Sequence, residues 1–401
     1  MTDQSEETYD NRIDCNKRKK GIGAMIYFDN SATTKPYPEV LKSFQQVSER
    51  YYGNPSSIHA FGSEAERLLQ QSKKQASQLL GVQSDEIVFT SGGTEGNNLA
   101  VKGIALQHQN RGKHIITTSV EHPSVLEACR SLESLGFEVT YLSVNEHGRV
   151  SVEDVQKAIR ENTILISVMH VNNELGTIQP IEEIAMVARQ YPKLYFHVDH
   201  VQGLGKTGLD LSLIDLCTMS SHKIHGLKGT GILYVKRNTS LFPLLHGGSQ
   251  EASYRAGTEN LPGIVAMVKA IRMTKENQKN NMQHLKELHH YLREKISEID
   301  EVVMNTPSES APHIVNFSVP GYKPEVVIHA LGEEGIFIST KSACSSKHAD
   351  ESAVLTACGH SHERSSAGLR VSITYDNTKE EGARFIHVLR NVLTELKEVM
   401  G

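Results

Sequence analysis

The chain has 401 residues, a formal net charge of -5 and no tryptophan, and 38% of its residues are hydrophobic against 22% charged. This is the composition of an ordinary globular protein, and the length predicts two or three domains or one large α/β domain with an appendage. The mild acidity gives no reason to expect direct nucleic-acid binding, and no apolar run approaches the roughly 18 residues that span a membrane. Because the start of the chain lacks a signal-peptide core, we expect a cytoplasmic protein.

The first residues, 1–24, are polar and follow neither a helical nor a strand period, so we expect a disordered tail. Met25 begins the first patterned segment, and our hypothesis is that it is the functional start of the chain. We expect residues 25–40 to form an N-terminal segment that joins the smaller of two domains.

Between about 62 and 245, apolar strand-like runs alternate with amphipathic helical segments such as 62–80 and 151–160. This alternation predicts an α/β fold with a mostly parallel sheet covered by helices on both faces, which we expect to form a large domain over 41–275. Such sheets bind ligands at the carboxyl ends of their strands. The strand-like runs are 87–89, 115–117, 139–142, 164–168, 195–198 and 231–235.

A long helix rich in lysine and glutamate is predicted over 260–298, where it would link the two domains. Residues 276–401 are then expected to form a smaller α/β domain. Its predicted elements are a strand at 313–318, a helix near 324–334, a flexible polar stretch at 339–352 and a final helix near 378–397.

Cysteine and histidine usage predicts no resident metal. The five cysteines are odd in number and lack metal-ligand spacing, so a disulfide framework is not expected either. The twenty histidines contain no zinc signature. Cys129 and Cys217 lie in helix-like and strand-like patterns, which favours core packing for both.

A glycine-rich turn follows the first strand-like run and opens a helix. Gly93 and Thr94 lie in this turn, within Thr90-Ser91-Gly92-Gly93-Thr94-Glu95. Glycines let the backbone approach a phosphate, and a helix N-terminus offers it donors and a favourable dipole. The alternative is a plain strand-to-helix turn.

Polar residues also follow the next strand-like runs. His122 could stack on an aromatic cofactor and exchange protons near neutral pH, although a helix-capping turn is the alternative. The amides in Asn172-Asn173-Glu174 could donate to an anionic oxygen, although an ordinary turn would also explain them.

Lys223, in Ser220-Ser221-His222-Lys223, and Asp199, in Val198-Asp199-His200, together predict a pyridoxal 5′-phosphate site. The lysine would attach the cofactor covalently, and the aspartate would pair with the pyridine nitrogen, so that the ring can accept electrons from a substrate carbon. Gln202 could reach the ring hydroxyl. A surface lysine and a solvated loop acid are the alternatives.

Three further segments are candidates for binding or chemistry. The glycine-rich stretch 246–260, which contains Thr258, could close over an anion, or it could be a flexible loop. Cys344 lies in a small, polar segment, where a reactive thiol would have the exposure that it needs. Arg370, in a strand-like segment, could clamp a carboxylate with two hydrogen bonds, or form a surface ion pair.

Taken together, these motifs resemble the class V aminotransferase family, and within it the NifS/IscS-like cysteine desulfurases. The similarity extends over about residues 26 to 397. The shared motifs include Asp29-Asn30-Ser31-Ala32-Thr33-Thr34, Thr90-Ser91-Gly92-Gly93-Thr94-Glu95, Glu121-His122, His170-Val171-Asn172-Asn173-Glu174, Ser220-x-His222-Lys223, Ser342-Ala343-Cys344-Ser345 and Leu369-Arg370.

The resemblance implies a fold-type-I pyridoxal-phosphate enzyme that acts as a homodimer. It implies that Lys223 holds the cofactor, that Asp199 pairs with its ring nitrogen and that Gln202 contacts its phenolic oxygen. His122 would stack on the ring, and Thr258 would reach the phosphate from the partner subunit. The remaining phosphate-binding residues would be Gly93, Thr94, Ser220 and His222.

The implied reaction is desulfuration of L-cysteine to L-alanine, with Asn173 and Arg370 binding the substrate carboxylate and Cys344 taking the sulfur as a persulfide. Lys223 and His122 would be the other catalytic groups. The implied sulfur acceptor is an iron–sulfur scaffold protein, a tRNA-thiolating enzyme or a small sulfur carrier. Cys344 could also ligate a nascent iron–sulfur cluster transiently.

The same residues leave three other functions as alternatives: a selenocysteine lyase, a non-catalytic sulfur-relay scaffold and a plain aminotransferase. The chain also departs from the family pattern in four places. Lys341 replaces the usual glycine before Ser-Ala-Cys, His200 replaces an alanine and Ser221 replaces a glycine. After Arg370, Ser372-Ile373-Thr374-Tyr375 stands where Ser-Leu-Gly is usual. None of these changes removes a catalytic group.

Overall fold

The structure is a computed structural model that describes residues 25–340 and 351–400. The predicted tail at 1–24, Lys341 and Cys344 therefore lie outside the described residues. Within the described ranges, no helix is long and apolar enough to cross a bilayer.

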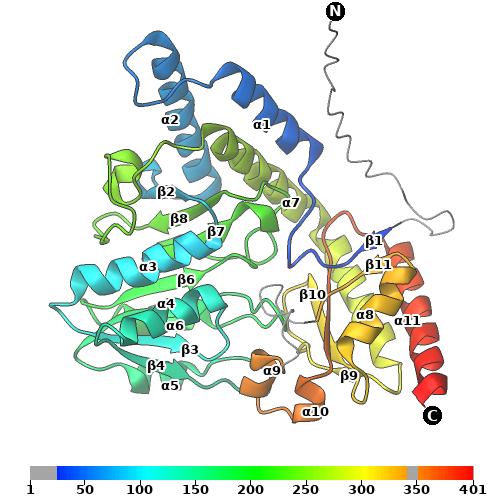
Figure 1. The fold of residues 1–401 in the computed structure, drawn as a ribbon. Coiled ribbons are helices and arrows are strands. Elements are labelled where there is room, and N and C mark those ends of the chain that lie inside the picture. Colours follow the sequence, from blue (N-terminus) through cyan, green and yellow to red (C-terminus); the bar gives the residue numbers. More distant parts are fainter. Residues whose placement is uncertain (1–24, 341–350, 401) are drawn as a thin grey trace, which may run out of the picture.

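The largest sheet has seven strands in the order β2-β8-β7-β6-β5-β3-β4 (Figure 1). Strand β8 is antiparallel to both neighbours, whereas every other neighbouring pair is parallel. The mostly parallel sheet is thereby confirmed, but strand β7 and the reversal of β8 were not predicted. The strands are β2 (Ile87–Thr90), β3 (His114–Thr118), β4 (Glu138–Leu142), β5 (Thr163–Met169), β6 (Tyr195–Asp199), β7 (Leu216–Ser220) and β8 (Gly231–Val235).

Helices cover both faces of this sheet because successive strand side chains point to opposite sides. In β2, Ile87 and Phe89 belong to one hydrophobic cluster and Val88 to the other. Helices α3 and α4 pack into the cluster of Val88, and α2, α5, α6 and the first half of α7 pack into the other. Their bounds are α2 (Ala60–Leu80), α3 (Gly93–His108), α4 (Pro123–Glu133), α5 (Val152–Ala158), α6 (Ile181–Ala188) and α7 (Leu261–Ser297).

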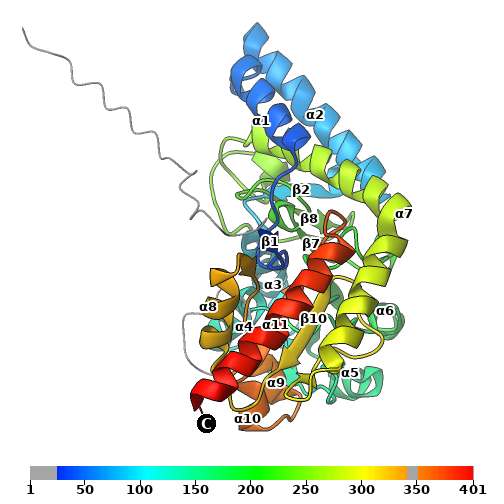
Figure 2. The same cartoon turned by 90° about the vertical axis from the view of Figure 1, so that its right-hand side faces the viewer.

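Helix α7 matches the long helix predicted over 260–298, and it joins two hydrophobic cores. The Asn260 side chain accepts a hydrogen bond from Gly263 N and caps its start. Apolar residues as far as Ile271 pack against the large sheet, whereas those from Leu285 onward pack into a separate cluster. Figure 2 shows this helix running the length of the molecule beside α11.

The second core lies beneath a three-stranded antiparallel sheet of order β12-β10-β9. A two-stranded parallel sheet, β1 with β11, brings the start of the described chain to this core. Helices α1 and α2 extend away from the rest of the molecule in both views (Figures 1 and 2). The remaining bounds are α1 (Pro38–Arg50), α8 (Pro324–Glu333), α9 (Ala353–Ala357), α10 (His362–Ser365), α11 (Lys379–Met400), β1 (Ile26–Tyr27), β9 (Val303–Met304), β10 (Ile314–Ser318), β11 (Ile336–Phe337) and β12 (Gly368–Ser372).

Strand direction decides where the site forms. Because β8 alone is reversed, the other six strands end at the same edge of the sheet. Asp199 is the last residue of a strand that ends there, and the glycine-rich turn, His122, Asn173 and Lys223 follow other strands that end there. Residues far apart in the sequence therefore meet at the carboxyl edge, where open α/β sheets bind ligands.

Candidate active site

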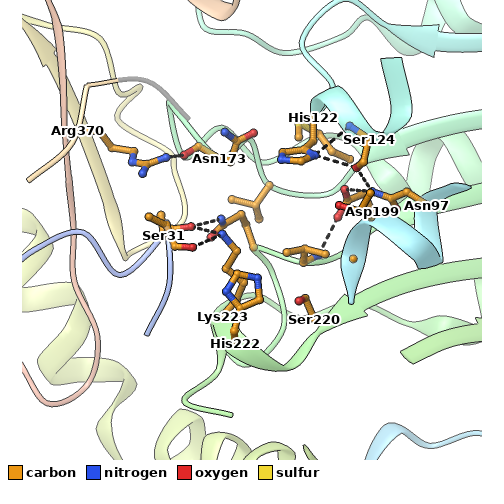
Figure 3. Close-up of a pocket in the computed structure, with 17 residues that line it drawn as sticks. Ser31, Asn97, His122, Ser124, Asn173, Asp199, Ser220, His222, Lys223 and Arg370 are labelled. Atoms are coloured by element: carbon orange, nitrogen blue, oxygen red, sulfur yellow. Dashed lines mark hydrogen bonds between the residues drawn. The ribbon is translucent and has the colours of Figure 1, made fainter. Parts of the chain in front are cut away.

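A pocket of ≈ 170 Å³ lies at this edge, between the large sheet and the second core (Figure 3). With one exception, every described residue that the sequence predicted for the site lines it. These residues are Gly93, Thr94, His122, Asn173, Asp199, Gln202, Ser220, His222, Lys223 and Arg370.

Lys223 ends a short 3-10 turn, Ser221–Lys223, directly after β7, and its amine extends into the pocket. Its Nζ donates to the carbonyl oxygens of Ser31 at 2.5 Å and Ala32 at 2.9 Å. The main-chain carbonyl of Lys223 accepts a hydrogen bond from the buried Lys206 Nζ at 2.8 Å. The lysine is therefore fixed at both its side chain and its backbone.

Asp199 closes β6, and its carboxylate accepts two hydrogen bonds. Asn97 Nδ2 donates to Oδ2 at 2.7 Å, and Val201 N donates to Oδ1 at 3.0 Å. Asn97 Nδ2 also donates to Ser124 Oγ at 2.8 Å, and that hydroxyl lies 2.8 Å from His122 Nδ1. The carboxylate and the imidazole thus belong to one hydrogen-bonded network, as Figure 3 shows.

His122 lies at the start of α4, where its Nδ1 accepts a hydrogen bond from Ser124 N at 3.1 Å. Burial lowers the pKa of His122, and the nearby Lys223 charge lowers it further, while Asp199 opposes them. The imidazole is accordingly neutral at neutral pH.

Several polar atoms buried around the pocket have no hydrogen-bond partner among the described residues. They are Ser31 Oγ, Gln202 Oε1, Ser220 Oγ and Arg370 Nε. Buried polar groups almost always have partners, so this concentration of unpaired donors and acceptors indicates a polar ligand. Gln202 is held by its other end, because its Nε2 donates to Ser31 O at 3.0 Å.

The α3 N-terminus has donors that could receive an anion. Gly93 and Thr94 form its first turn, and the first amides of a helix lack intrahelical partners. A Cβ on Gly93 would lie 3.0 Å from Val201 Cγ2, a tight contact that the glycine avoids. Burial and the nearby lysines lower the pKa of His222 to about 4, so it is a neutral hydrogen-bonding group.

Arg370 is 1% exposed and enters the pocket from β12. One terminal nitrogen donates to Asn173 O at 2.8 Å, and the other donates to Asp29 Oδ1 at 3.0 Å and to Ser339 Oγ at 2.7 Å. These contacts orient the guanidinium while its Nε remains unpaired among the described residues. The guanidinium is therefore held in a fixed orientation with a donor left for an anionic group.

Thr258 is the exception among the predicted residues. It lines a separate cavity with Arg255, Glu259 and Glu251, and not the pocket of its own chain. Sequence reasoning also assigned no role to Asn97, Ser124, Ser31 and Lys206. Ser31 lies inside a motif that carries the family resemblance, Asp29 to Thr34, which was the signal available for it, whereas Asn97 lies two residues beyond the motif that ends at Glu95.

The histidine that departs from the family pattern has a defined place. His200 Nδ1 lies 2.8 Å from His170 Nδ1, and the two rings stack with centroids 4.9 Å apart. Burial lowers the pKa of both, that of His170 to about 4. A Cβ at Gly203 would collide with the His200 ring, so the glycine makes room for the pair.

Comparison with known proteins gives consistent matches over nearly the whole chain. The model of the family "Aminotransferase class-V" matches residues 26–385. A "NifS/IcsS protein homolog" of Lactobacillus delbrueckii subsp. bulgaricus is 45% identical over 386 residues, covering 94% of this chain and 99% of that protein. A "Cysteine desulfurase IscS" of Dictyoglomus turgidum is 42% identical over 378 residues, covering 93% of this chain and 96% of that protein.

Solved structures agree with these relatives. A "NifS-like protein" superposes with a TM-score of 0.87 at 34% identity, covering 92% of this chain and 100% of that chain. A structure described as "SspA in complex with cysteine" superposes with a TM-score of 0.77 at 36% identity, covering 87% of this chain and 98% of that chain.

Proposed function

The chain belongs to the class-V aminotransferase family, among its NifS/IscS-type cysteine desulfurases, and we propose that it converts L-cysteine to L-alanine with Cys344 as the sulfur acceptor. It is an enzyme of the sulfurtransferase type. The relatives named as cysteine desulfurases favour neither the selenocysteine lyase nor the non-catalytic relay considered from the sequence.

Pyridoxal 5′-phosphate is the cofactor that the pocket residues fit. The unpaired Ser220 hydroxyl and the first turn of α3 suit a phosphate ester, and Asp199 suits a protonated ring nitrogen. Lys223 would attach the cofactor, and Gln202 and His122 would contact its ring. The bound cofactor would act as an electron sink for the α-carbon of the substrate.

The other side chains of the pocket would bind the substrate carboxylate and transfer protons. Arg370, with Asn173, holds the carboxylate of L-cysteine through donors that the guanidinium keeps available. This contact would fix the α-carbon near Lys223, whose Nζ would take the α-proton. His122, neutral at neutral pH, would handle protons at its Nε2.

Cys344 would supply the reaction that separates this enzyme from a transaminase. Its thiolate attacks the substrate sulfur, the Cβ–S bond breaks, and that electron pair takes up a proton to give L-alanine. The new S–S bond leaves a persulfide on Cys344, so L-cysteine and a thiol become L-alanine and a persulfide without an external oxidant. An acceptor protein then removes the sulfur.

One observation carries the proposal: Lys223, Asp199, His122 and Arg370 converge on one pocket whose buried polar atoms lack partners among the described residues. The test is to mix purified protein that carries its cofactor with L-cysteine and a thiol reductant, and to quantify alanine. We expect steady production that is lost in Cys344→Ala and kept in Cys358→Ala, a matched control at a buried cysteine. Equal production by the wild type and Cys344→Ala would remove Cys344 from the mechanism.

The proposal extends to a homodimer. Thr258 faces a cavity away from its own pocket, which suits a residue that serves the partner's phosphate site. Large apolar side chains are also exposed on the protruding α1 and α2 region, where a second copy could cover them. They are Leu41, Phe44, Tyr52, Ile58 and Phe61.

Three further parts of the proposal concern organisation and context. We assign residues 41–275 to the cofactor-binding part and 276–401 to the smaller part, and the change of core along α7 supports this division. A reactive thiol such as Cys344 stays reduced in the cytoplasm, which is the location we propose. The sulfur acceptor would belong to iron–sulfur cluster assembly or to thiolation of tRNA or a cofactor.

A further inference from the structure

Asn97 is a buried side chain to which the mechanism above gives no part. It lies in the second turn of α3 and is 1% exposed. The helix approaches β7 closely there, because a Cβ on Gly96 would lie only 2.7 Å from Thr218 Cγ2. Thr218 pairs with Asp199 across β6 and β7. The glycine thus lets Asn97 reach a carboxylate that is 102 positions away in the sequence.

The Asn97 amide joins Asp199 to Ser124, the neighbour of His122. Its Nδ2 donates to Asp199 Oδ2 at 2.7 Å and to Ser124 Oγ at 2.8 Å. An amide nitrogen carries two hydrogens, so both bonds form at once. Ser124 Oγ then lies 2.8 Å from His122 Nδ1 and completes a chain from the carboxylate to the imidazole.

The direction of this chain follows from its carboxylate end. An ionised Asp199 only accepts, so Asn97 donates, and Ser124 Oγ accepts from Asn97. The Ser124 hydroxyl hydrogen is then left for His122 Nδ1, which also accepts Ser124 N–H at 3.1 Å. Two donors on Nδ1 leave the imidazole proton on Nε2.

We propose that Asn97 and Ser124 are positioning residues, which hold Asp199 and His122 as one unit and fix His122 as its Nε2–H tautomer. Asp199 and His122 then keep a fixed geometry relative to each other before the cofactor binds. Neither Asn97 nor Ser124 takes part in proton transfer. The part of this inference that concerns the cofactor rests on the proposed function.

The first test measures the dissociation constant of pyridoxal 5′-phosphate for the cofactor-free protein, in the wild type, Asn97→Leu, Ser124→Ala and the double variant. Leucine keeps the size of asparagine and removes its donors. We expect each single variant to bind the cofactor about tenfold more weakly, because it breaks the hydrogen-bonded chain and leaves Asp199 or His122 less firmly held. The double variant should be within about twofold of Asn97→Leu, since residues in one network are not additive.

The matched control is Asn305→Leu, at another buried asparagine with side-chain partners on Asn316 and Ser318, in the second core. It should lower the melting temperature and leave the dissociation constant unchanged. Unchanged affinity in Asn97→Leu, or losses that multiply in the double variant, would overturn the proposal. A wild type that does not bind the cofactor would instead refute the proposed function.

The second test does not depend on the cofactor. Nitrogen-15 NMR of the cofactor-free protein, with histidine labelled and His122 assigned by its loss in His122→Asn, reports which ring nitrogen carries the proton. We expect an unprotonated Nδ1 and a protonated Nε2 at neutral pH. A proton on Nδ1 would reverse the chain and overturn the inference even if the affinities change.

Discussion

Lys206 is a buried lysine whose removal should stabilise the protein. Among the described residues, its hydrogen bond goes to the carbonyl of Lys223, and no carboxylate pairs with it. Burial, helped by the charge of Lys223, lowers the pKa of Lys206 from 10.5 to about 7. His200 and His313, which are also buried, lie close enough for the Lys206 charge to lower their pKa values.

The sign and size of the effect follow from this pKa. Below pH 7 the lysine is protonated in both the native and unfolded states, and the native state bears the full cost of the buried charge. Between pH 7 and 10.5 only the unfolded chain is protonated, so the cost shrinks as the pH rises. At 1.36 kcal/mol per pH unit the full cost is about 5 kcal/mol. The lost hydrogen bond to Lys223 offsets about 2 kcal/mol of it.

We therefore expect Lys206→Met to raise the free energy of unfolding by about 3 kcal/mol at pH 7, with a gain that falls by about 1.4 kcal/mol per pH unit above that. Urea unfolding followed by circular dichroism at several pH values measures this, since the chain has no tryptophan. Lys228→Met, at an exposed lysine, is the control and should show no such dependence. A gain that does not vary with pH, or a loss at pH 7, would refute the reasoning.

Three further substitutions test other parts of the site. Burial raises the pKa of Glu121 from 4.5 to about 8, so Glu121→Gln should be more stable than the wild type. The difference in the free energy of unfolding should grow between pH 4.5 and 8 and be absent below pH 4.5, and urea unfolding that shows the reverse trend would contradict this. Arg370→Lys loses the forked guanidinium, and steady-state kinetics should show KM for L-cysteine rising at least tenfold while kcat changes less; an unchanged KM would remove Arg370 from carboxylate binding. Gly96→Ala should push α3 away from Thr218, which lowers the melting temperature and the affinity for pyridoxal 5′-phosphate. Adding Thr218→Ser removes the colliding methyl group but keeps the hydroxyl, so it should restore both quantities. Failure of this rescue would point to another cause.

Short-range patterns determined most of the fold and the choice of candidate site residues. Alternating strand and helix periods predicted the covered sheet, and polar residues at the ends of strand-like runs predicted Asp199 and His122 at one edge. Lys223 was predicted from its residue pattern with Asp199, whereas the strand before it, β7, was not predicted. These inferences succeed because strand period and turn chemistry depend on neighbours in the sequence. The rule that parallel strands present their carboxyl ends together then brings the motifs into one site.

Only the tertiary structure decided which other groups hold these residues in place. Lys206 has the sequence context of an ordinary surface lysine, and only its burial against the Lys223 carbonyl reveals a stability cost. Asn97 meets Asp199, and Ser31 meets Lys223, across 102 and 192 positions. Such pairs depend on strand register, on the reversal of β8 and on how closely α3 packs at Gly96. Local sequence preferences do not encode them, because each is set by several chain segments packing together.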